Sequence, residues 1–238
     1  MPTIEFHSPS DRYMRVFDAP IPAKDILPDW YKEQSRWVDG IKNNLTPEGL
    51  ANHTVKACMP IFDMLTAGYI LPCQCDITFI TEDGIHSYAS WPTGEMEAIY
   101  SHNRFQYDKL PVDLDVWQPN AFKFMQNWLV KTPPGYSTLF VHPFWHGDMP
   151  FYSLPGVVDT DNHPISVQIP FFLKKGYSGV IKTGTPIIQM IPFKREEWDS
   201  KVVFDPEQSE EWNIQWARAS RQPKDKYKTN FREDKVWE

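Results

Sequence analysis

Three histidines and one aspartate lie within a short stretch of the second half of the chain: His142, His146, Asp148 and His163. The run His146-Gly147-Asp148 has the His-X-Asp form with which non-haem iron oxygenases and some cupins hold a metal, using one carboxylate and two imidazoles. His163 is the candidate for the remaining ligand. The sequence therefore offers a transition-metal site at His146, Asp148 and His163, and the alternative is a set of loop histidines that cap or pair locally.

Asp159 and Asp161 form a second candidate group, separated by one residue. On a regular strand both carboxylates would point to one face, where their repulsion is costly without a cation or a hydrogen-bond donor. One interpretation is a functional carboxylate pair with catalytic roles. The other is an Asp-rich turn between strands, whose side chains bond nearby backbone amides.

The cysteines give a weaker signal. Cys58, Cys73 and Cys75 are odd in number, and the single residue between Cys73 and Cys75 rarely permits a structural disulfide, so we expect reduced thiols. Two thiolates without a second Cys or His pair fall short of a structural zinc site. Whether this pair has any role is left open.

Charge and motif content exclude several common functions. The net charge is −7, and the lysines and arginines are scattered, which argues against nucleic acid as a partner. No nucleophile elbow, Walker loop or dinucleotide fingerprint occurs, so the commonest hydrolase, NTPase and Rossmann functions are not indicated.

The sequence predicts neither a membrane-spanning segment nor an export signal. The longest apolar stretches, residues 165–173 and 186–193, are well short of the about 18 residues that a spanning helix needs. The N-terminal residues show no signal for secretion, so we expect a cytoplasmic protein, in the host cytoplasm if it is phage-encoded.

Composition favours a β protein in which these residues are held by short strands. The chain has 22 prolines and 15% aromatic residues, a combination that interrupts helices and suits sheet surfaces. At 238 residues we expect one domain over 1–238. Its expected regions are an extended segment with short helices (1–70), a β core (71–195) and a C-terminal helix with a tail (196–238).

The expected elements follow from periodicity and turn residues. Three- and four-residue spacing predicts short helices at about 28–40 and 59–66. Alternation around Asp83-Gly84 predicts a hairpin of residues 76–81 and 85–91, and residues 107–119 should be irregular. Further strands are expected at 127–132, 137–142, 151–159, 165–173, 178–182 and 186–193, followed by a capped surface helix after Asp205.

The order of four short segments resembles the dUTPase family. They are Thr66–Tyr69, Thr132–Tyr136, Gly156–Asp161 and Lys182–Met190. The resemblance implies a jelly-roll-like fold, often trimeric, with Mg-bound nucleotide sites in which Asp159 would orient the attacking water. Asn162 stands where that family places an aromatic residue under the base, and the Arg-Ser pair of its second motif is absent at 142–145, so the family's catalysis is absent or altered.

The whole chain is also similar to an uncharacterised family of marine phage and bacterial proteins. The segments that carry this similarity are Ile21–Lys24, Leu27–Tyr31, Cys58–Asp63, Pro155–Asp161 and Ile191–Glu196. The resemblance implies an origin and supplies no mechanism.

Together these features predict a mainly β protein with a few short helices, built as a jelly roll or a distorted β-barrel, dUTPase-like or cupin-like. The first hypothesis is that its loops bind a small polar ligand, with a nucleotide as first candidate and Mg or a transition metal as an open cofactor choice. The ligand-binding candidates are Tyr136, His142, Trp145 and Asn162. The alternatives are a metal-dependent oxygenase and a non-catalytic assembly protein; whether the chain is an enzyme or a homo-oligomer is left open.

Overall fold

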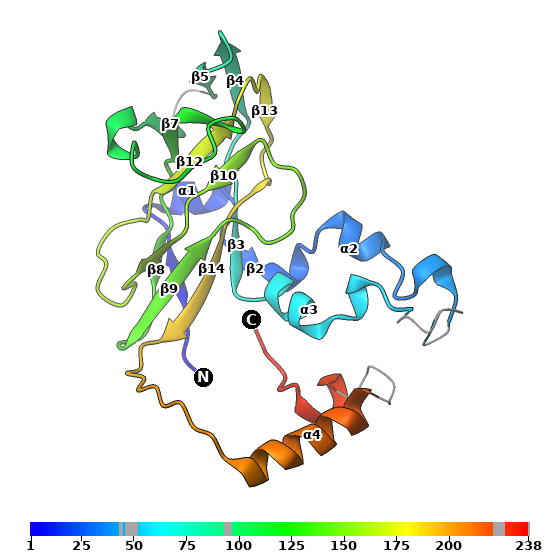
Figure 1. Cartoon of the computed structure of the whole chain (residues 1–238). Coiled ribbons are helices and arrows are strands. Elements are labelled where there is room, and N and C mark those ends of the chain that lie inside the picture. The colour runs from blue at the N-terminus through cyan, green and yellow to red at the C-terminus, as the bar shows by residue number, and fades with distance from the viewer. Residues whose placement is uncertain (43–44, 46–51, 93–96, 221–226, 238) are drawn as a thin grey trace. The chain divides into compact units, whose positions relative to one another are not determined.

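The structure is a computed structural model that describes residues 1–42, 45, 52–92, 97–220 and 227–237. In these residues it is mainly β, with 14 strands in four antiparallel sheets and a few short helices (Figure 1). The expectation of a mainly β protein is therefore confirmed. None of the four sheets closes into a barrel in the part of the chain that the structure describes.

Contacts divide the chain into two compact units. Unit 1 comprises Met1–Pro28 and Thr66–Arg195 together with Trp237, and unit 2 comprises Asp29–Leu65 and Glu196–Val236. The first 28 residues thus belong with the expected β core, whereas the second half of the expected N-terminal region belongs with the C-terminal helix. The single domain over 1–238 stays a prediction.

Unit 1 contains all the sheets. The five-stranded sheet has the order β11-β9-β14-β3-β2 and consists of β11 (Gly156–Val158), β9 (Tyr136–Val141), β14 (Pro186–Lys194), β3 (Tyr69–Pro72) and β2 (Ile21–Pro22). The four-stranded sheet has the order β10-β12-β7-β6 and consists of β10 (Phe151–Ser153), β12 (Ile169–Lys174), β7 (Trp117–Phe124) and β6 (Ile99–Ser101).

Two smaller sheets complete unit 1. The three-stranded sheet has the order β13-β4-β5, with β13 (Gly179–Ile181), β4 (Ile77–Glu82) and β5 (His86–Ser90). The two-stranded sheet pairs β1 (Glu5–His7) with β8 (Leu129–Lys131). The helices of this unit are α1 (Asp11–Val16), η1 (Ala23–Asp25) and η4 (Arg104–Gln106).

The core of unit 1 is built on stacked phenylalanines from several sheets. Phe124 on β7 and Phe171 on β12 lie with ring centroids 4.0 Å apart and nearly parallel, and Phe151 on β10 meets both edge-on. Phe79 on β4 contacts Phe171 from the three-stranded sheet at 6.3 Å. Such offset and edge-to-face contacts add to the hydrophobic stabilisation from burial.

The hairpin predicted around Asp83-Gly84 is confirmed. β4 pairs with β5 in a register that sets Glu82 opposite His86, and Asp83 and Gly84 have φ values of 48° and 80°. Two consecutive positive φ values are what a tight turn with the twist of the flanking strands requires. The local sequence therefore determines this part of the fold.

Three expectations about the extent of strands are wrong. The strand expected at 165–173 begins only at Ile169, as β12. The expected strand at 151–159 is two strands, β10 and β11, which lie in different sheets because Leu154-Pro155 interrupts the ladder. The expected irregular segment 107–119 ends in β7, which begins at Trp117. Its pairing with β12 is irregular near Pro119, and that proline masked the strand in the sequence.

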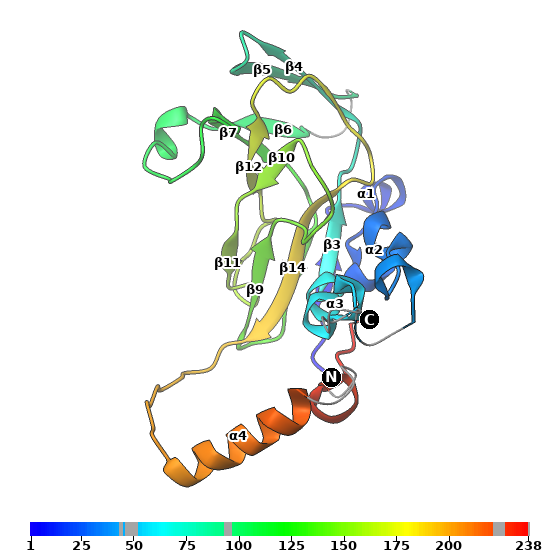
Figure 2. The same cartoon turned by 45° about the vertical axis from the view of Figure 1, so that its right-hand side comes forward.

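Unit 2 contains the remaining helices, seen from a second angle in Figure 2. They are α2 (Asp29–Glu33), η2 (Val38–Gly40), η3 (Val55–Ala57), α3 (Met59–Leu65), α4 (Pro206–Ser220) and the π-helical turn η5 (Tyr227–Phe231). The helices expected at 59–66 and after Asp205 are confirmed, and the Asp205 side chain accepts a hydrogen bond from the Gln208 amide at 3.1 Å. Residues 221–226 of the expected tail lie outside the described residues.

The helix expected at about 28–40 is wrong in length, since α2 ends at Glu33. The next residues bond to a distant segment instead: the Arg36 carbonyl accepts a hydrogen bond from the Thr54 amide at 3.0 Å, and Trp37 bridges His53. Tertiary pairing thus overrides the helical periodicity. Among the described helices, none is both long and apolar enough to pass through a bilayer.

Candidate functional site

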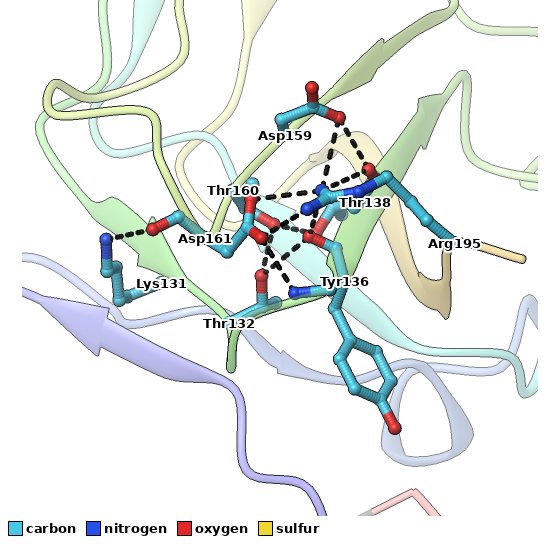
Figure 3. A network of polar contacts seen from close by, with 10 residues as sticks. Lys131, Thr132, Tyr136, Thr138, Asp159, Thr160, Asp161 and Arg195 are labelled. Carbon is cyan, nitrogen blue, oxygen red and sulfur yellow. Dashed lines mark hydrogen bonds and ion pairs between the residues drawn. The ribbon is translucent and has the colours of Figure 1, made fainter.

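The acidic turn after β11 is held by an arginine that the sequence did not single out as a site residue. The Arg195 guanidinium binds both carboxylate oxygens of Asp161, and the Gly135 amide donates a further hydrogen bond to it at 2.9 Å (Figure 3). The hydrogen bonds from Arg195 hold the pKa of Asp161 down at about 2. Asp161 is therefore ionised and its side chain, only 5% exposed, is occupied by donors of the protein itself.

Three buried threonine hydroxyls lie beneath this turn. Thr160 exchanges hydrogen bonds with Thr132 at 2.7 Å and with Thr138 at 2.8 Å. These contacts join the turn to β9 and to the segment before it, as Figure 3 shows. These buried hydroxyl groups thus form hydrogen bonds with one another and stabilise the turn.

Asp159 is the more open of the two predicted catalytic carboxylates. It accepts a hydrogen bond from the Ser137 hydroxyl at 2.6 Å and lies 3.3 Å from Arg195, but its side chain is 64% exposed. The structure thus brings Asp159 and Asp161 together around one arginine. Asp161 is held by donors of the protein itself, whereas Asp159 keeps an exposed side chain; whether the pair has a catalytic role stays a prediction.

His142 begins the loop after β9 and is partly buried between aromatic rings. Its Nδ1 accepts a hydrogen bond from the Ser153 amide at 3.2 Å, and the rings of Phe151 and Tyr152 lie 5.8 and 5.1 Å away. Burial, together with the nearby charge of His146, lowers the pKa of His142 to about 4. The neutral imidazole is therefore a structural acceptor near neutral pH.

A buried side chain of the five-stranded sheet binds the backbone of the loop that follows His142. Gln189, fully buried on β14, accepts a hydrogen bond from the Phe144 amide at 3.2 Å and donates to the Ala67 carbonyl at 2.7 Å. Trp145, one of the predicted ligand-binding residues, has a φ of 57° and is 64% exposed.

The histidine loop and the acidic turn lie at opposite ends of β9. Val158 pairs with Thr138 at the start of that strand, whereas His142 follows its last residue, Val141. At about 3.3 Å per residue, the distance from Ser137 to His142 is about 16 Å. The length of β9 therefore separates the acidic turn from the histidine loop.

Two of the three predicted metal ligands, Asp148 and His163, have other partners. Asp148 is paired with Lys174, and the Nδ1–H of His163 donates to the Ile165 carbonyl at 2.6 Å. Among the residues that the structure describes, no three His, Cys, Asp or Glu side chains gather in a way that could hold a metal ion. Within the described residues, His146, Asp148 and His163 thus do not form a set of three metal ligands.

The two other predicted ligand-binding residues also take local positions. The Tyr136 carbonyl joins the acidic cluster by accepting a hydrogen bond from Arg195 at 2.8 Å, while its ring points away from the cluster (Figure 3). The Asn162 amide donates to the Asp159 carbonyl at 3.0 Å as part of the turn.

The histidine loop does border a pocket, and no residue of the acidic turn is among those that line it. This pocket, which we call the lysine pocket, has a volume of about 310 Å³ and combines two lysines with a phenol, a hydroxyl and apolar walls. It is lined by Asp148, Pro150, Lys174, Tyr177, Val180, Ile181, Lys182 and Thr185. Its residues come from the histidine loop, the end of β12, β13 and the turn before β14.

Each lysine of the pocket has a carboxylate partner. The Lys174 ammonium lies 3.0 Å from both oxygens of Asp148, whose side chain is 85% exposed. Lys182 donates to Asp76 at 2.8 Å, and Asp76 also accepts hydrogen bonds from the amide and hydroxyl of Thr183. The Lys182 hydrogen bond, with those of Thr183, lowers the pKa of Asp76 to about 2.

Tyr177 is fixed at the wall of the pocket by its surroundings. Its carbonyl accepts a hydrogen bond from the Thr81 hydroxyl, and its ring lies so close to Gly179 that a Cβ there would approach the phenol oxygen to 2.7 Å. Burial raises the pKa of Tyr177, so its hydroxyl stays protonated and can donate.

Sequence reasoning did not name the pocket lysines as candidate site residues, although Lys182 begins the last of the four dUTPase-like segments. The signal that was present is their context: both precede a glycine turn, in Lys174-Lys175-Gly176 and in Lys182-Thr183-Gly184. Lys174 ends β12 and Lys182 follows β13, strands of two different sheets that a short loop connects. That both line one pocket is visible only in the tertiary structure.

The cysteine pair shows no sign of a reactive thiolate. Burial raises the pKa of Cys73 to about 12 and also raises that of Cys75, and the Cys73 thiol donates to the Cys75 carbonyl at 3.2 Å.

Comparison of the whole chain with protein-family models, with curated proteins and with solved structures finds no match, so the chemistry of this molecule is argued from its own geometry.

Proposed function

We propose that this protein binds a small anionic ligand in the lysine pocket, with a nucleotide as the first candidate. The observation that supports this is the convergence of Lys174 and Lys182 with Tyr177 around a volume of about 310 Å³. That volume is at the lower end of the range for small-molecule sites, and it suits a ligand of mononucleotide size or smaller. Ammonium groups are common phosphate ligands.

The Asp148 carboxylate is a partner of Lys174 that an anionic ligand can replace. Its ion pair with Lys174 is solvent-exposed, and such pairs contribute about 0 to 1 kcal/mol. A phosphate can therefore replace the carboxylate at little cost. Asp76 differs, because the Thr183 amide and hydroxyl hold it in place, so Lys182 stays oriented by a fixed partner.

The jelly-roll or barrel arrangement, the dUTPase relationship and the phage or bacterial origin stay predictions. The proposal does not require dUTPase-like catalysis. It keeps the expectation of a small polar ligand near the histidine loop and moves the site from the acidic turn to the lysines.

The test is a thermal-shift screen of the whole chain against nucleoside mono- and triphosphates and inorganic pyrophosphate, with and without Mg²⁺. At a ligand concentration one hundred times Kd, binding stabilises the folded state by about 2.7 kcal/mol, which is a Tm increase of about 5 to 10 °C for this length. If none of these anions raises the Tm, the proposal is wrong.

Variants locate the site. Lys174→Ala and Lys182→Ala should each weaken binding about tenfold, whereas Asp148→Ala should strengthen it several-fold by freeing Lys174. Lys175→Ala is the matched control, because this neighbouring lysine donates to the Leu114 carbonyl and does not line the pocket. Equal losses in Lys175→Ala and Lys174→Ala would show that general surface charge, and not the pocket, binds the anion.

A further inference from the structure

The segment between β14 and α4 carries large apolar side chains that the chain leaves exposed. We call residues 196–205 the arm; it has no helix or strand and is drawn as an irregular stretch between those two elements in Figures 1 and 2. Trp198, Val202, Val203 and Phe204 are 86%, 103%, 64% and 84% exposed. Four large apolar residues within seven positions form a concentration of apolar surface that marks an interaction site more often than a free surface.

The sequence of the arm also favours a strand. Lys201-Val202-Val203-Phe204 is β-branched and aromatic, which is typical of strands and not of open loops. An extended segment with these side chains is suited to pairing with another strand.

We propose that the arm pairs antiparallel with the arm of a second copy of this chain and so joins two copies into a homodimer. A two-fold interface uses the same surface on both partners, so the segment must be complementary to itself. In a symmetric antiparallel pair one residue must lie opposite its own copy, which leaves only a few registers to compare.

Charge selects among these registers. Centring the pair on Lys201 sets two ammonium groups opposite each other, and centring it on Val202 sets Asp199 opposite Asp205. Like charges directly opposite each other destabilise a strand pair. Both of these registers are therefore disfavoured.

Centring the pair on Val203 gives favourable pairs throughout. Lys201 then lies opposite Asp205 of the second copy, and Val202 lies opposite Phe204. Val202 and Phe204 of both arms share one face of the pair, whereas Val203 lies on the other face, opposite its own copy. Of these three registers, only this one sets opposite charges against each other. A pair centred on Ser200 would also set Asp199 opposite Lys201, and the cross-linking experiment below distinguishes it from the register centred on Val203.

Exposed apolar residues on α4 add to the apolar area of the arm. Trp212 and Ile214 on α4 are a further 60% and 46% exposed, directly after the arm in the sequence. With about 150 to 250 Å² for each aromatic side chain, the exposed apolar residues of the arm and α4 supply about 700 Å² per copy. Two copies together approach the about 1,600 Å² of a standard interface.

A cysteine at the centre of the pair tests the register directly. Val203→Cys places two thiols opposite each other at a separation suited to a disulfide, whereas Ser200→Cys places them about six residues apart, about 20 Å. We expect diamide to convert most of the Val203→Cys protein to a covalent dimer on a non-reducing gel, with the Ser200→Cys protein at the level of the wild type and its three native cysteines. Equal cross-linking of both variants would overturn the proposed register and with it the arm pairing.

The mass in solution tests the dimer itself. Light scattering of the full chain at about 50 µM should give twice 27.9 kDa. Val203→Glu sets two carboxylates opposite each other and should weaken the dimer at least a hundredfold, giving the monomer mass. Val157→Glu is the matched control, because Val157 is 58% exposed on β11 and outside the arm, and it should stay dimeric.

Either of two results would overturn the proposal. One is a monomeric wild type, which would mean that the arm serves a different partner. The other is a Val203→Glu variant that remains dimeric, which would place the interface elsewhere. Both are independent of anion binding, since the lysine pocket contains no residue of the arm.

Discussion

His142 shows at the residue scale how burial turns a candidate catalytic group into a structural one. A histidine with a pKa of about 4 is neutral at physiological pH and unsuited to hold a positive charge. Its hydrogen bond from the Ser153 amide also defines the tautomer, because Nδ1 must be the acceptor.

This pKa predicts a pH dependence of stability. The unfolded chain takes up the proton at a pKa of about 6.5 and the folded chain only at about 4, so stability is lost as the pH falls through this window. The total loss is about 3 kcal/mol. His142→Gln keeps an acceptor for Ser153 and removes the titration, so its Tm should fall less than that of the wild type between pH 7 and 4.5. Parallel Tm curves for the two proteins would contradict this assignment.

At the element scale, β3 can lie against β14 only because a glycine precedes it. Gly68 has a φ of 67°, and a Cβ at this position would lie 2.0 Å from the Met190 carbonyl oxygen. Any other residue at this position would therefore be destabilised both by the positive φ and by a clash with the backbone of β14.

Gly68→Ala is therefore expected to destabilise the protein by about 3 kcal/mol or more, measured by urea unfolding. Gly84→Ala is the matched control, since Gly84 has a similar φ of 80° but open space around it, and it should cost only about 1 kcal/mol. The difference in free energy of unfolding between the two variants measures the contribution of the backbone contact with β14. Equal losses would show that backbone conformation alone explains the glycine.

At the scale of the whole molecule, ion pairs join segments far apart in the chain. In unit 2, the buried Asp63 of α3 binds the Arg232 guanidinium at 2.8 Å and the Lys235 ammonium at 3.0 Å. Burial would raise the pKa of Asp63, but the hydrogen bonds and charges of these two cations outweigh it and lower the pKa. In unit 1, Asp161 and Arg195 join the acidic turn to the end of β14 in the same way.

Asp63→Asn should destabilise unit 2 by about 3 kcal/mol, because it leaves a buried arginine without its main counter-ion. The measurement is urea unfolding together with the rate of tryptic cleavage in the C-terminal residues. Asp234→Asn is the control: Asp234 also pairs with Arg232 at 2.8 Å, but its side chain is 91% exposed and its removal should cost less than about 1 kcal/mol. Comparable effects of the two variants would contradict a role for burial in this cluster.

The sequence by itself determined the features that depend on neighbouring residues. The β class, the hairpin at Asp83-Gly84, α3 and the capped start of α4 follow from side-chain alternation, turn residues and capping, all of which act within a few positions. The pair Asp159 and Asp161 was also recognised as a turn or a functional pair from its spacing alone.

The tertiary structure decided everything that depends on which strands lie together. The partner of Asp161 is Arg195, 34 residues away, and the two lysines that line one pocket lie at the ends of strands of two different sheets. The histidine loop and the acidic turn are close in sequence but lie at opposite ends of β9. Strand pairing sets such distances through long-range contacts, and the local sequence pattern does not encode which strands become neighbours.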